Sequence, residues 1–454
     1  MLGVEHLAIL SAEILLYFQE SYMSEVVLSA GDTAWVLASS ALVLLMTPGL
    51  ALFYGGMVRS KSVLNMMMMS MVTIGIVSVL WVIYGFKLAF GYEANSEWYG
   101  SFSLSGLGEV VDELANNGGV YPIPLLVFAV FQLMFAIITP ALISGAIADR
   151  AKFLSWGVFV AIWVTVVYFP VAHWVFAFGN KVGDEITGAG FLAARGVQDF
   201  AGGTAVHINA GAAALALAIV LGRRIGWQKS PMRPHSLPLV LLGAALLWFG
   251  WFGFNAGSSL GANAIAGLAF LNTQVATAGA VLGWILMEKI RDGHFTSLGA
   301  ASGAVAGLVA ITPACAFVAP WAAVVIGFLA GAVCALAVGL KYRFRFDDSL
   351  DVVGVHLVGG IIGSLAIGFF GSSAVNSIGL DGIFYGGGTE LLVKQALGVG
   401  LVMAYSFIMT LIIGFAIEKT IGFRVNSDNE IGGVDLSEHG ESAYELGGIL
   451  KGGR

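Results

Sequence analysis

Long apolar stretches recur along this chain of 454 residues and constrain its fold more than any other feature. A helix needs roughly 20 apolar residues to cross the hydrocarbon core of a bilayer, and eleven stretches reach about that length. Only 11% of the residues are charged, against about a quarter in a typical soluble domain, so water cannot be the solvent of most of the surface. The chain is therefore predicted to be an all-α integral membrane protein with eleven transmembrane helices. The predicted spans are Thr33–Met57, Val63–Gly91, Pro122–Asp149, Phe153–Phe178, Ala201–Leu221, His235–Ser258, Ala262–Ile290, Leu298–Phe317, Pro320–Leu340, Val353–Gly371 and Leu391–Ile421.

Basic residues fall in every second connector between these spans, and the other connectors are acidic or nearly uncharged. By the positive-inside rule this pattern places the N-terminus outside and the C-terminus inside, and an odd number of spans gives the same topology. We therefore predict a transmembrane domain over residues 31–422 and a cytoplasmic tail over residues 423–454. The basic connector residues are Arg59, Lys61, Arg150, Lys152, Arg223, Arg224, Lys229, Arg233, Lys289, Arg291, Lys341, Arg343 and Arg345.

The N-terminal segment, residues 1–30, does not have the pattern of a secretory signal. Glu5 stands where such signals carry basic residues, and Glu13 interrupts the apolar run. Residues 16–21 are similar to an altered protease-tag remnant, and Met23 is then a possible natural start.

A short pattern occurs twice, five spans apart. The pattern is Val-His with a glycine four positions after the histidine. It occurs at His207 in span five and at His356 in span ten. Two five-helix halves related in this way would have opposite orientations in the membrane, which is the inverted-repeat plan that places a substrate path between the halves. The sequence thus favours two inverted five-helix repeats plus a final helix, although a match this short also fits two unrelated glycine-packed helices.

Ionisable side chains inside spans are costly and mark functional candidates. Two facing neutral imidazoles can bond to each other and still offer a nitrogen to a small polar molecule in a lumen, so His207 and His356 are candidate pore residues. The alternative is that each histidine is a satisfied buried group holding helices together. No third ligand lies at metal-binding spacing, and Cys315 and Cys334 are interpreted as packing residues, so we expect no metal or other cofactor.

Asp199 stands at the outer end of span five, shortly before His207. A carboxylate at this position can accept hydrogen bonds from the first N–H groups of the helix and complement the positive end of the helix dipole. Capping is one interpretation of Asp199. The other is that its charge preorganises an entrance for a cation.

Aromatic residues gather in the outer halves of spans three, four and six. Most membrane aromatics are core or belt residues, but aromatic faces also attract cations by about 0.5–2 kcal/mol each. Phe131 and Phe135 share one helix face, so one could belong to a vestibule and the other to a gate beneath it. Ser258 can accept a hydrogen bond from a cationic N–H donor, or can bond only to its local backbone. The remaining aromatic candidates are Trp174, Phe176, Trp251 and Phe254.

Five segments read together resemble the ammonium transporter (Amt/Mep/Rh) family, and the resemblance runs in order from about Gly31 to the end of the chain. Members of this family are homotrimers, and each eleven-helix protomer has its own narrow hydrophobic pore. The resemblance implies that an external vestibule recruits ammonium, that a phenylalanine gate follows, and that twin histidines line the pore. The matching segments are Phe53–Gly56, Asp199–Ala210, Gly250–Ser258, Thr312–Cys315 and Asp351–His356.

The resemblance assigns a role to each candidate. It implies a vestibule of Phe131, Phe176 and Ser258, a gate of Phe135 and Phe254, a pore of His207 and His356 with Trp251, and an essential carboxylate at Asp199. Many relatives have tryptophan where this chain has Phe176, and phenylalanine lacks the stronger indole quadrupole and its N–H. Recruitment is therefore expected to be weaker unless Trp174 compensates, which its two-residue offset on a helix makes doubtful.

The function expected from these observations is an ammonium channel or transporter, not an enzyme, in the cytoplasmic membrane. Ammonium is expected to lose its proton near the gate and to pass as ammonia, with or without proton co-transfer, because a dry apolar pore excludes a charge. Methylammonium is the expected analogue. The alternative is an ammonium sensor that signals through its tail with little flux, and carbon dioxide conduction has only the family analogy behind it. The expected partners are other copies of the chain and the bilayer, with no nucleic acid. The family resemblance also implies a PII-type signal protein at the tail, and the alternative is that the tail is a solvated charged segment.

Overall fold

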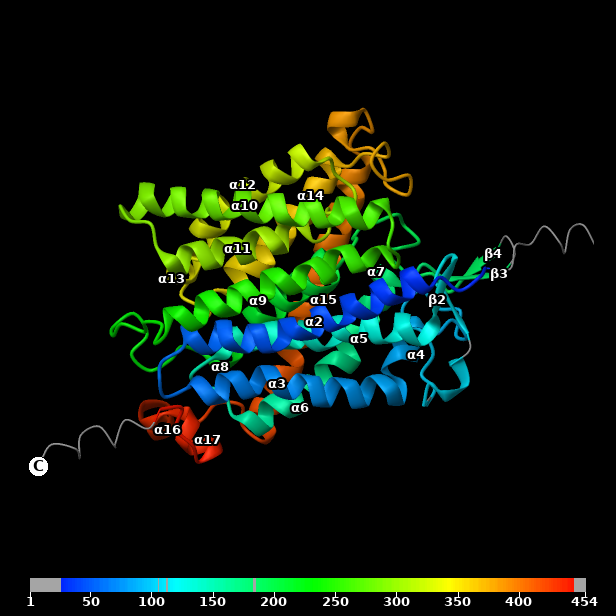
Figure 1. Cartoon of the computed structure of the whole chain (residues 1–454). Helices are drawn as coiled ribbons and strands as arrows, with labels where there is room; N and C mark the ends of the chain where they lie inside the picture. Colours follow the sequence, from blue (N-terminus) through cyan, green and yellow to red (C-terminus); the bar gives the residue numbers. More distant parts are fainter. Residues whose placement is uncertain (1–25, 105, 112, 183–184, 445–454) are drawn as a thin grey trace, which may run out of the picture.

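The protein is a bundle of long helices that run roughly along one common direction (Figure 1). The computed structural model describes residues 26–444 apart from residues 105, 112 and 183–184. Ten helical segments in this part of the chain are long and apolar enough to cross a membrane, as expected of a multi-pass membrane protein. These segments are α2 (Ala30–Met57), α3–η1–α4 (Val63–Leu80, Trp81–Gly85 and Phe86–Phe90), α5–η3 (Leu125–Ile143 and Ser144–Ile147), α6–η4–α7 (Phe153–Trp163, Val164–Tyr168 and Phe169–Phe176), η5–α8 (Gly203–Ile208 and Asn209–Leu221), α9–η6 (Leu237–Ala256 and Gly257–Ser259), α10 (Ala264–Asp292), α12–α13 (Pro320–Ala337 and Leu340–Phe344), η7–α14 (Val353–Leu357 and Val358–Phe370) and α15 (Glu390–Thr420).

The eighth predicted span is shorter than expected. The sequence predicts Leu298–Phe317, but the helix there, α11 (Ser297–Ile311), has 15 residues and turns follow it. Pro313 lies in these turns, where it has no N–H to continue a helical ladder. Its carbonyl oxygen instead accepts from Phe200 N at 3.1 Å, next to the segment that leads into η5. The early end of α11 thus helps to position the candidate site.

Short structured connections lie at one end of the bundle, here called the hairpin end. Two antiparallel hairpins form there, from β1 (Leu114–Asn116) with β2 (Val120–Pro124) and from β3 (Asn180–Val182) with β4 (Glu185–Thr187). Figure 1 shows them beside the start of α2. The other short turns are η2 (Gly108–Val110) and η8 (Ile383–Tyr385). The predicted tag remnant and start at Met23 lie outside the described residues.

The C-terminal segment packs against the opposite end, here called the tail end. It contains α16 (Ser427–Gly432) and α17 (Val434–His439), which lie at the far side of the bundle from the hairpins (Figure 1). Ile225 N donates to Glu430 Oε1 at 2.6 Å, Asn65 N donates to Asp435 Oδ1 at 2.8 Å, and Phe153 N donates to Glu438 Oε2 at 2.9 Å. The tail is therefore held by backbone donors from three separate parts of its own chain: the connector after α8, the start of α3 and the start of α6.

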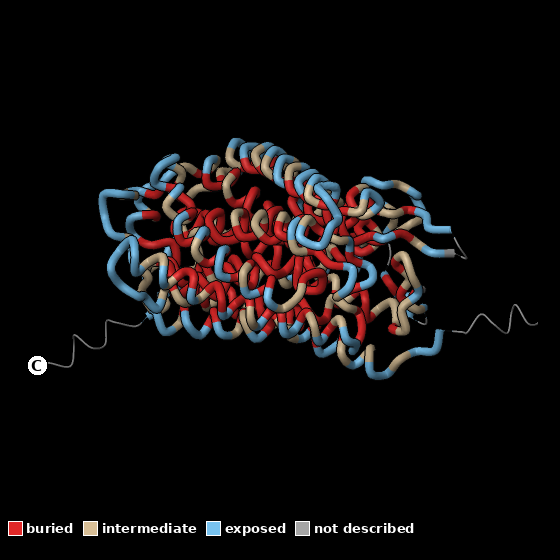
Figure 2. The backbone as a smooth tube through the Cα atoms, turned by 90° about the horizontal axis from the view of Figure 1, so that it is seen from above, coloured by how far each residue is buried: buried red, intermediate tan, exposed pale blue. Residues whose placement is uncertain are grey.

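The helices bury their facing sides and leave apolar residues on the outside. Figure 2 shows buried residues along the middle of the bundle and exposed ones on its periphery. Many of the exposed residues are large and apolar, among them Phe249, Leu282 and Ile412, which is the surface that lipid would cover.

A buried charge network lies between the helix ends at the tail end. Arg224 pairs with Asp149 and with Asp347, each at 2.9 Å, and Arg59 pairs with Asp149 at 3.2 Å. Burial by itself would lower the pKa of Arg224, but its bonds to the two carboxylates outweigh burial and raise it. Burial would likewise raise the pKa of Asp347, and the Arg224 guanidinium instead holds it below its usual value. These pairs tie together four connectors that are far apart in the sequence.

Candidate functional site

The two predicted pore histidines meet in the middle of the bundle. His207 lies in η5 and His356 in η7; their ring centroids are 5.3 Å apart, the rings lie 24° from parallel, and the two Nδ1 atoms are 3.3 Å apart in a hydrogen bond. Both side chains are buried, and His207 Nε2 has no hydrogen-bond partner. A buried nitrogen that is unpaired within the protein can bond to a small polar molecule.

Glycine allows the two histidine-bearing helices to come this close. Gly211, four residues after His207, approaches the other helix so closely that an added Cβ would lie 2.5 Å from Leu357 N. Gly360, four residues after His356, would place its Cβ 3.0 Å from Gly203 O. The repeated Val-His pattern therefore has a structural reason at both positions, since each glycine makes room for the opposite histidine segment.

An aromatic stack leads from His207 toward the hairpin end. The Phe254 ring centroid is 6.0 Å from that of His207 and 4.4 Å from that of Phe135, while Trp251 stacks beside His207 at 5.4 Å. Trp251 Nε1 donates to Thr312 Oγ1 at 2.8 Å, which fixes the indole against the imidazole. The predicted gate pair, Phe135 and Phe254, is thus in direct contact and adjacent to the histidines.

A small cavity of 40 Å³ lies on the hairpin side of Phe135. Phe176 and Ser258, two of the three predicted vestibule residues, both line it. Phe131 does not line this cavity; it is buried, with its ring centroid 5.0 Å from that of Phe135. The remaining lining residues, which the sequence did not single out, are Asn117, Phe128, Gln132, Phe178, Phe200 and Leu260.

The hydrogen bonds of Ser258 and Trp174 indicate which of the two side chains can contact a ligand in this cavity. The Ser258 hydroxyl donates to Phe254 O at 2.8 Å, so its oxygen lone pairs remain to accept from a ligand. Trp174 Nε1 donates to Trp98 O at 2.8 Å and its ring packs 4.8 Å from that of Tyr405, away from the cavity lining. Trp174 therefore does not replace the aromatic surface that Phe176 provides.

A second cavity of 10 Å³ lies on the tail side of the histidines. His356 lines it together with residues from α2, α11 and the start of η7. These other residues come from parts of the chain that are far apart, and Phe53, Tyr54, Asp351 and Val355 fall in segments that the sequence analysis had singled out. The other lining residues are Phe53, Tyr54, Met57, Ser302, Val305, Leu350, Asp351 and Val355.

Asp199 has the geometry of a helix cap. Its Oδ1 accepts from Gly202 N and Gly203 N, each at 2.7 Å, and its Oδ2 accepts from Thr204 N at 2.8 Å and Thr204 Oγ1 at 2.5 Å. Gly202 has φ 119°, a conformation that favours glycine, which turns the chain so that four successive N–H groups face the carboxylate. Asp199 lines neither cavity.

Asp348 occupies the matching position before His356. It precedes His356 by eight residues, just as Asp199 precedes His207, and its Oδ2 accepts from Val353 N, the first residue of η7, at 2.7 Å. Burial, with the neighbouring charge of Asp351, raises the pKa of Asp348. The sequence analysis missed this carboxylate, although its spacing from the histidine was a signal that could have found it.

The site offers little to a metal ion. Within residues 26–444, leaving out the four undescribed positions, no group of three or more His, Cys, Asp or Glu side chains could hold one. Cys315 and Cys334 are both buried, and neither forms a disulfide.

Comparisons with known proteins identify the family of the chain. The sequence model of the Ammonium Transporter Family matches residues 34–444. An ammonium transporter of Mycobacterium tuberculosis is 55% identical over 434 residues, which cover 92% of this chain and 90% of that protein. The crystal structure of Saccharomyces cerevisiae Mep2 superposes with a TM-score of 0.78 at 34% identity, covering 88% of each chain. A solved structure described as a sensor Amt protein superposes with a TM-score of 0.81 at 30% identity, covering 90% of this chain and 98% of the other. The chain therefore belongs to the ammonium transporter family.

Proposed function

We propose that this protein carries ammonium across the cytoplasmic membrane, recruiting the cation at the hairpin end and passing ammonia between His207 and His356. The observation that carries the proposal is a continuous series of contacts. It runs from the cavity lined by Phe176 and Ser258, through the Phe135–Phe254 pair and the two histidines, to the cavity on the tail side.

The chemistry of these groups suits a proton loss at the gate. An intact ammonium ion would carry a charge into a lumen lined by aromatic rings and imidazoles, at a cost of many kcal/mol. Ammonia is a small neutral molecule that the imidazole nitrogens can hydrogen-bond, and His207 Nε2 is unpaired. Potassium has no N–H donor and cannot lose its charge, so the same route excludes it. Whether the proton follows through the histidines decides between neutral and charged transport.

The proposed topology has eleven spans with α11 as the eighth, the hairpin end outside and the tail end in the cytoplasm. Its support is the basic connectors, which lie at the tail end with Arg59, Arg150 and Arg224. We also propose that the first ten spans form two inverted halves. The matched pairs Asp199–His207 and Asp348–His356, each with the same spacing and a capped π-helical turn, support this relation.

Replacing His207 with alanine is expected to reduce the ammonium current about tenfold or more, because it removes one of the two imidazoles that replace hydration in the lumen. The measurement is solid-supported-membrane electrophysiology on liposomes that contain the purified protein, with ammonium, methylammonium and potassium pulses. His294→Ala, an exposed histidine outside the path, is the matched control and should carry the wild-type current. Equal currents in both variants would show that ammonia does not pass the histidine pair.

Replacing Phe176 with tryptophan is expected to lower the half-saturating ammonium concentration about two- to fivefold, because indole attracts a cation more strongly than phenyl by about 0.5–1 kcal/mol. The concentration dependence of the same currents measures it. Phe384→Trp, at an exposed position on η8, is the control. A half-saturating concentration unchanged by Phe176→Trp would remove Phe176 from the recruiting surface.

A sensor with little flux is the second candidate, favoured by the superposition on a sensor Amt protein. The two functions differ in turnover, so an internal pH dye in the same liposomes separates a conductor of neutral ammonia from a non-conducting sensor when no current is seen.

The relatives are transporters, which supports a protein without an enzymatic activity. We also propose a homotrimer with a PII-type protein as partner at the tail end, and the mass of the detergent-solubilised particle tests the first of these.

A further inference from the structure

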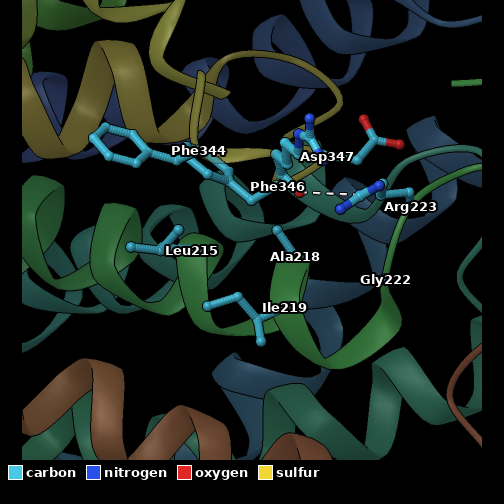
Figure 3. A pocket seen from close by; sticks show the side chains of 9 residues that line it. Leu215, Ala218, Ile219, Gly222, Arg223, Phe344, Phe346 and Asp347 are labelled. Atoms are coloured by element: carbon cyan, nitrogen blue, oxygen red, sulfur yellow. Dashed lines mark hydrogen bonds between the residues drawn. The ribbon is translucent and has the colours of Figure 1, made fainter. Parts of the chain in front are cut away.

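A groove of 660 Å³ opens at the tail end, away from the two cavities of the histidine path (Figure 3). One wall is the last turns of α8, with Leu215, Ala218 and Ile219, and the other is Phe344 and Phe346 at and just beyond the end of α13. Apart from Phe346, the apolar wall residues belong to two membrane-spanning segments, Gly203–Leu221 and Pro320–Phe344, and Ile219 and Phe344 are 48% and 67% exposed. The groove is therefore apolar at membrane depth.

Basic side chains stand where the groove reaches the boundary of the spans. Arg223 follows the last turn of α8, Arg345 follows α13, and both line the groove and are exposed. Arg223 Nε donates to Arg345 O at 3.0 Å, which is the dashed line in Figure 3, so the two connectors are held together with their guanidinium groups at one mouth.

The acidic residue at this mouth does not neutralise them. Asp347 also lines the groove, but its Oδ2 accepts from Arg224 N and Nε, at 2.8 and 2.9 Å, and its Oδ1 accepts from Arg224 Nη2 at 2.9 Å. Because Arg224 pairs with this carboxylate, the positive charges of Arg223 and Arg345 are left to attract an anion from outside.

We propose that this groove binds one anionic phospholipid, with an acyl chain between α8 and α13 and the phosphate at Arg223 and Arg345. The apolar walls of the groove match the acyl chain of such a lipid, and the two arginines at its mouth match the phosphate. Basic pockets between membrane helices are known to bind anionic head groups. The volume is in the range of about 300–1,000 Å³ that small-molecule sites have, too small for a folded partner.

The site would connect the bilayer to the tail. Arg424 Nη1 donates to Leu221 O and Arg424 Nη2 to Arg223 O, each at 2.8 Å, so the tail bonds to the same turn that carries the groove mouth. The helix that forms the apolar wall, α8, continues directly from η5 with His207. A bound lipid would therefore stabilise the contact between the tail and the end of α8. The lipid site does not depend on the transport route proposed above.

The test is a lipid titration followed by native mass spectrometry on the purified full-length protein. Phosphatidylglycerol should bind at least about fivefold more tightly than phosphatidylcholine of the same chain length, and Arg223→Ala/Arg345→Ala should weaken its tightest binding about thirtyfold, at about fivefold per charge. Lys229→Ala/Arg233→Ala, which removes two exposed charges from the next connector, should leave the binding within about twofold of the unmodified protein. Equal losses in the two double variants, or no preference for phosphatidylglycerol, would overturn the site.

Two further variants separate the lipid from other occupants. Ile219→Trp fills the apolar part of the groove without changing its charge, and it should weaken phosphatidylglycerol binding at least about fivefold. Arg223→Lys/Arg345→Lys keeps both positive charges, so it should retain most of the binding that Arg223→Ala/Arg345→Ala loses. If glycerol phosphate alone competes as well as the lipid, the site is one for a free phosphate anion and the proposal fails. Disulfide-linked pairs of Ile219→Cys chains would place a second copy in the groove, which also overturns it.

Discussion

Replacing Asp199 with alanine is expected to abolish ammonium transport and to lower the stability of the protein by about 3–5 kcal/mol. The change leaves the N–H groups of Gly202, Gly203 and Thr204 and the Thr204 hydroxyl without their acceptor in a buried site. Each buried donor left unpaired costs about 1–3 kcal/mol, and relaxation of the turn recovers part of the total. Since η5 begins at these residues, the turn that presents His207 loses its fixed position.

The measurements are the ammonium current in liposomes and the unfolding temperature of the purified protein. Asp199→Asn separates two roles, because it keeps one acceptor oxygen but removes the charge. Asp381→Ala is the control, since Asp381 accepts from Ser373 N and Oγ in an exposed connector and lies outside the path. Wild-type current in Asp199→Ala would show that the cap is dispensable for the histidine path.

Replacing Arg224 with leucine is expected to destabilise the protein by about 3–5 kcal/mol, the cost of leaving buried charges without their partner. Asp347 would lose its two bonds to the Arg224 side chain and keep only the bond from the backbone N–H of residue 224, and Asp149 would keep only Arg59. The loss should appear as a lower unfolding temperature and as easier proteolysis of the tail, because Glu430 is bonded to the neighbouring Ile225 N.

A second substitution tests the cause. Arg224→Leu/Asp347→Leu removes the pair together, and replacing both members of a buried ion pair by apolar groups is often nearly neutral, so this double variant should recover most of the lost stability. Arg233→Leu, an exposed arginine in the same connector, should change stability by less than about 0.5 kcal/mol. An Arg224→Leu protein as stable as this control would mean that water reaches the network.

The helical segments were the easiest part of the fold to predict. In a bilayer, the backbone N–H and C=O groups of each apolar run must hydrogen-bond to one another within a single helix. Ten of the predicted spans match the helical segments to within a few residues. The eighth was wrong in its extent, since apolar composition is the same in a helix and in the buried turns around Pro313, and only packing against η5 distinguishes them. The hairpins were not predicted, because their strands are only three to five residues long, too short to show a clear alternation of apolar and polar residues.

The candidate site was predictable where local sequence carries its chemistry. His207, His356 and the Phe135–Phe254 pair were singled out, and the structure brings them together. Phe131 shares a helix face with Phe135, yet periodicity alone cannot say which of two stacked rings reaches a cavity, and the structure places it behind Phe135. The groove of Arg223 and Arg345 depends on two connectors over a hundred residues apart, so no local pattern could reveal it.

The close crossing of the histidine helices limits how this protein can move. With Gly211 against the backbone of Leu357 and Gly360 against Gly203 O, the two helices have no free space in which to slide or rock past each other. On the route proposed above, the width of the passage between the histidines is then fixed by backbone contact, and the rings of Phe135 and Phe254 are the groups that would open or close it. Phe135 and Phe254 are buried, so their rings are expected to reorient more slowly than exposed side chains, which do so in picoseconds to nanoseconds. The helix bundle would therefore stay rigid during transport while only the two phenylalanine rings move. The turnover rate would then be limited by how often these rings rotate and protons transfer.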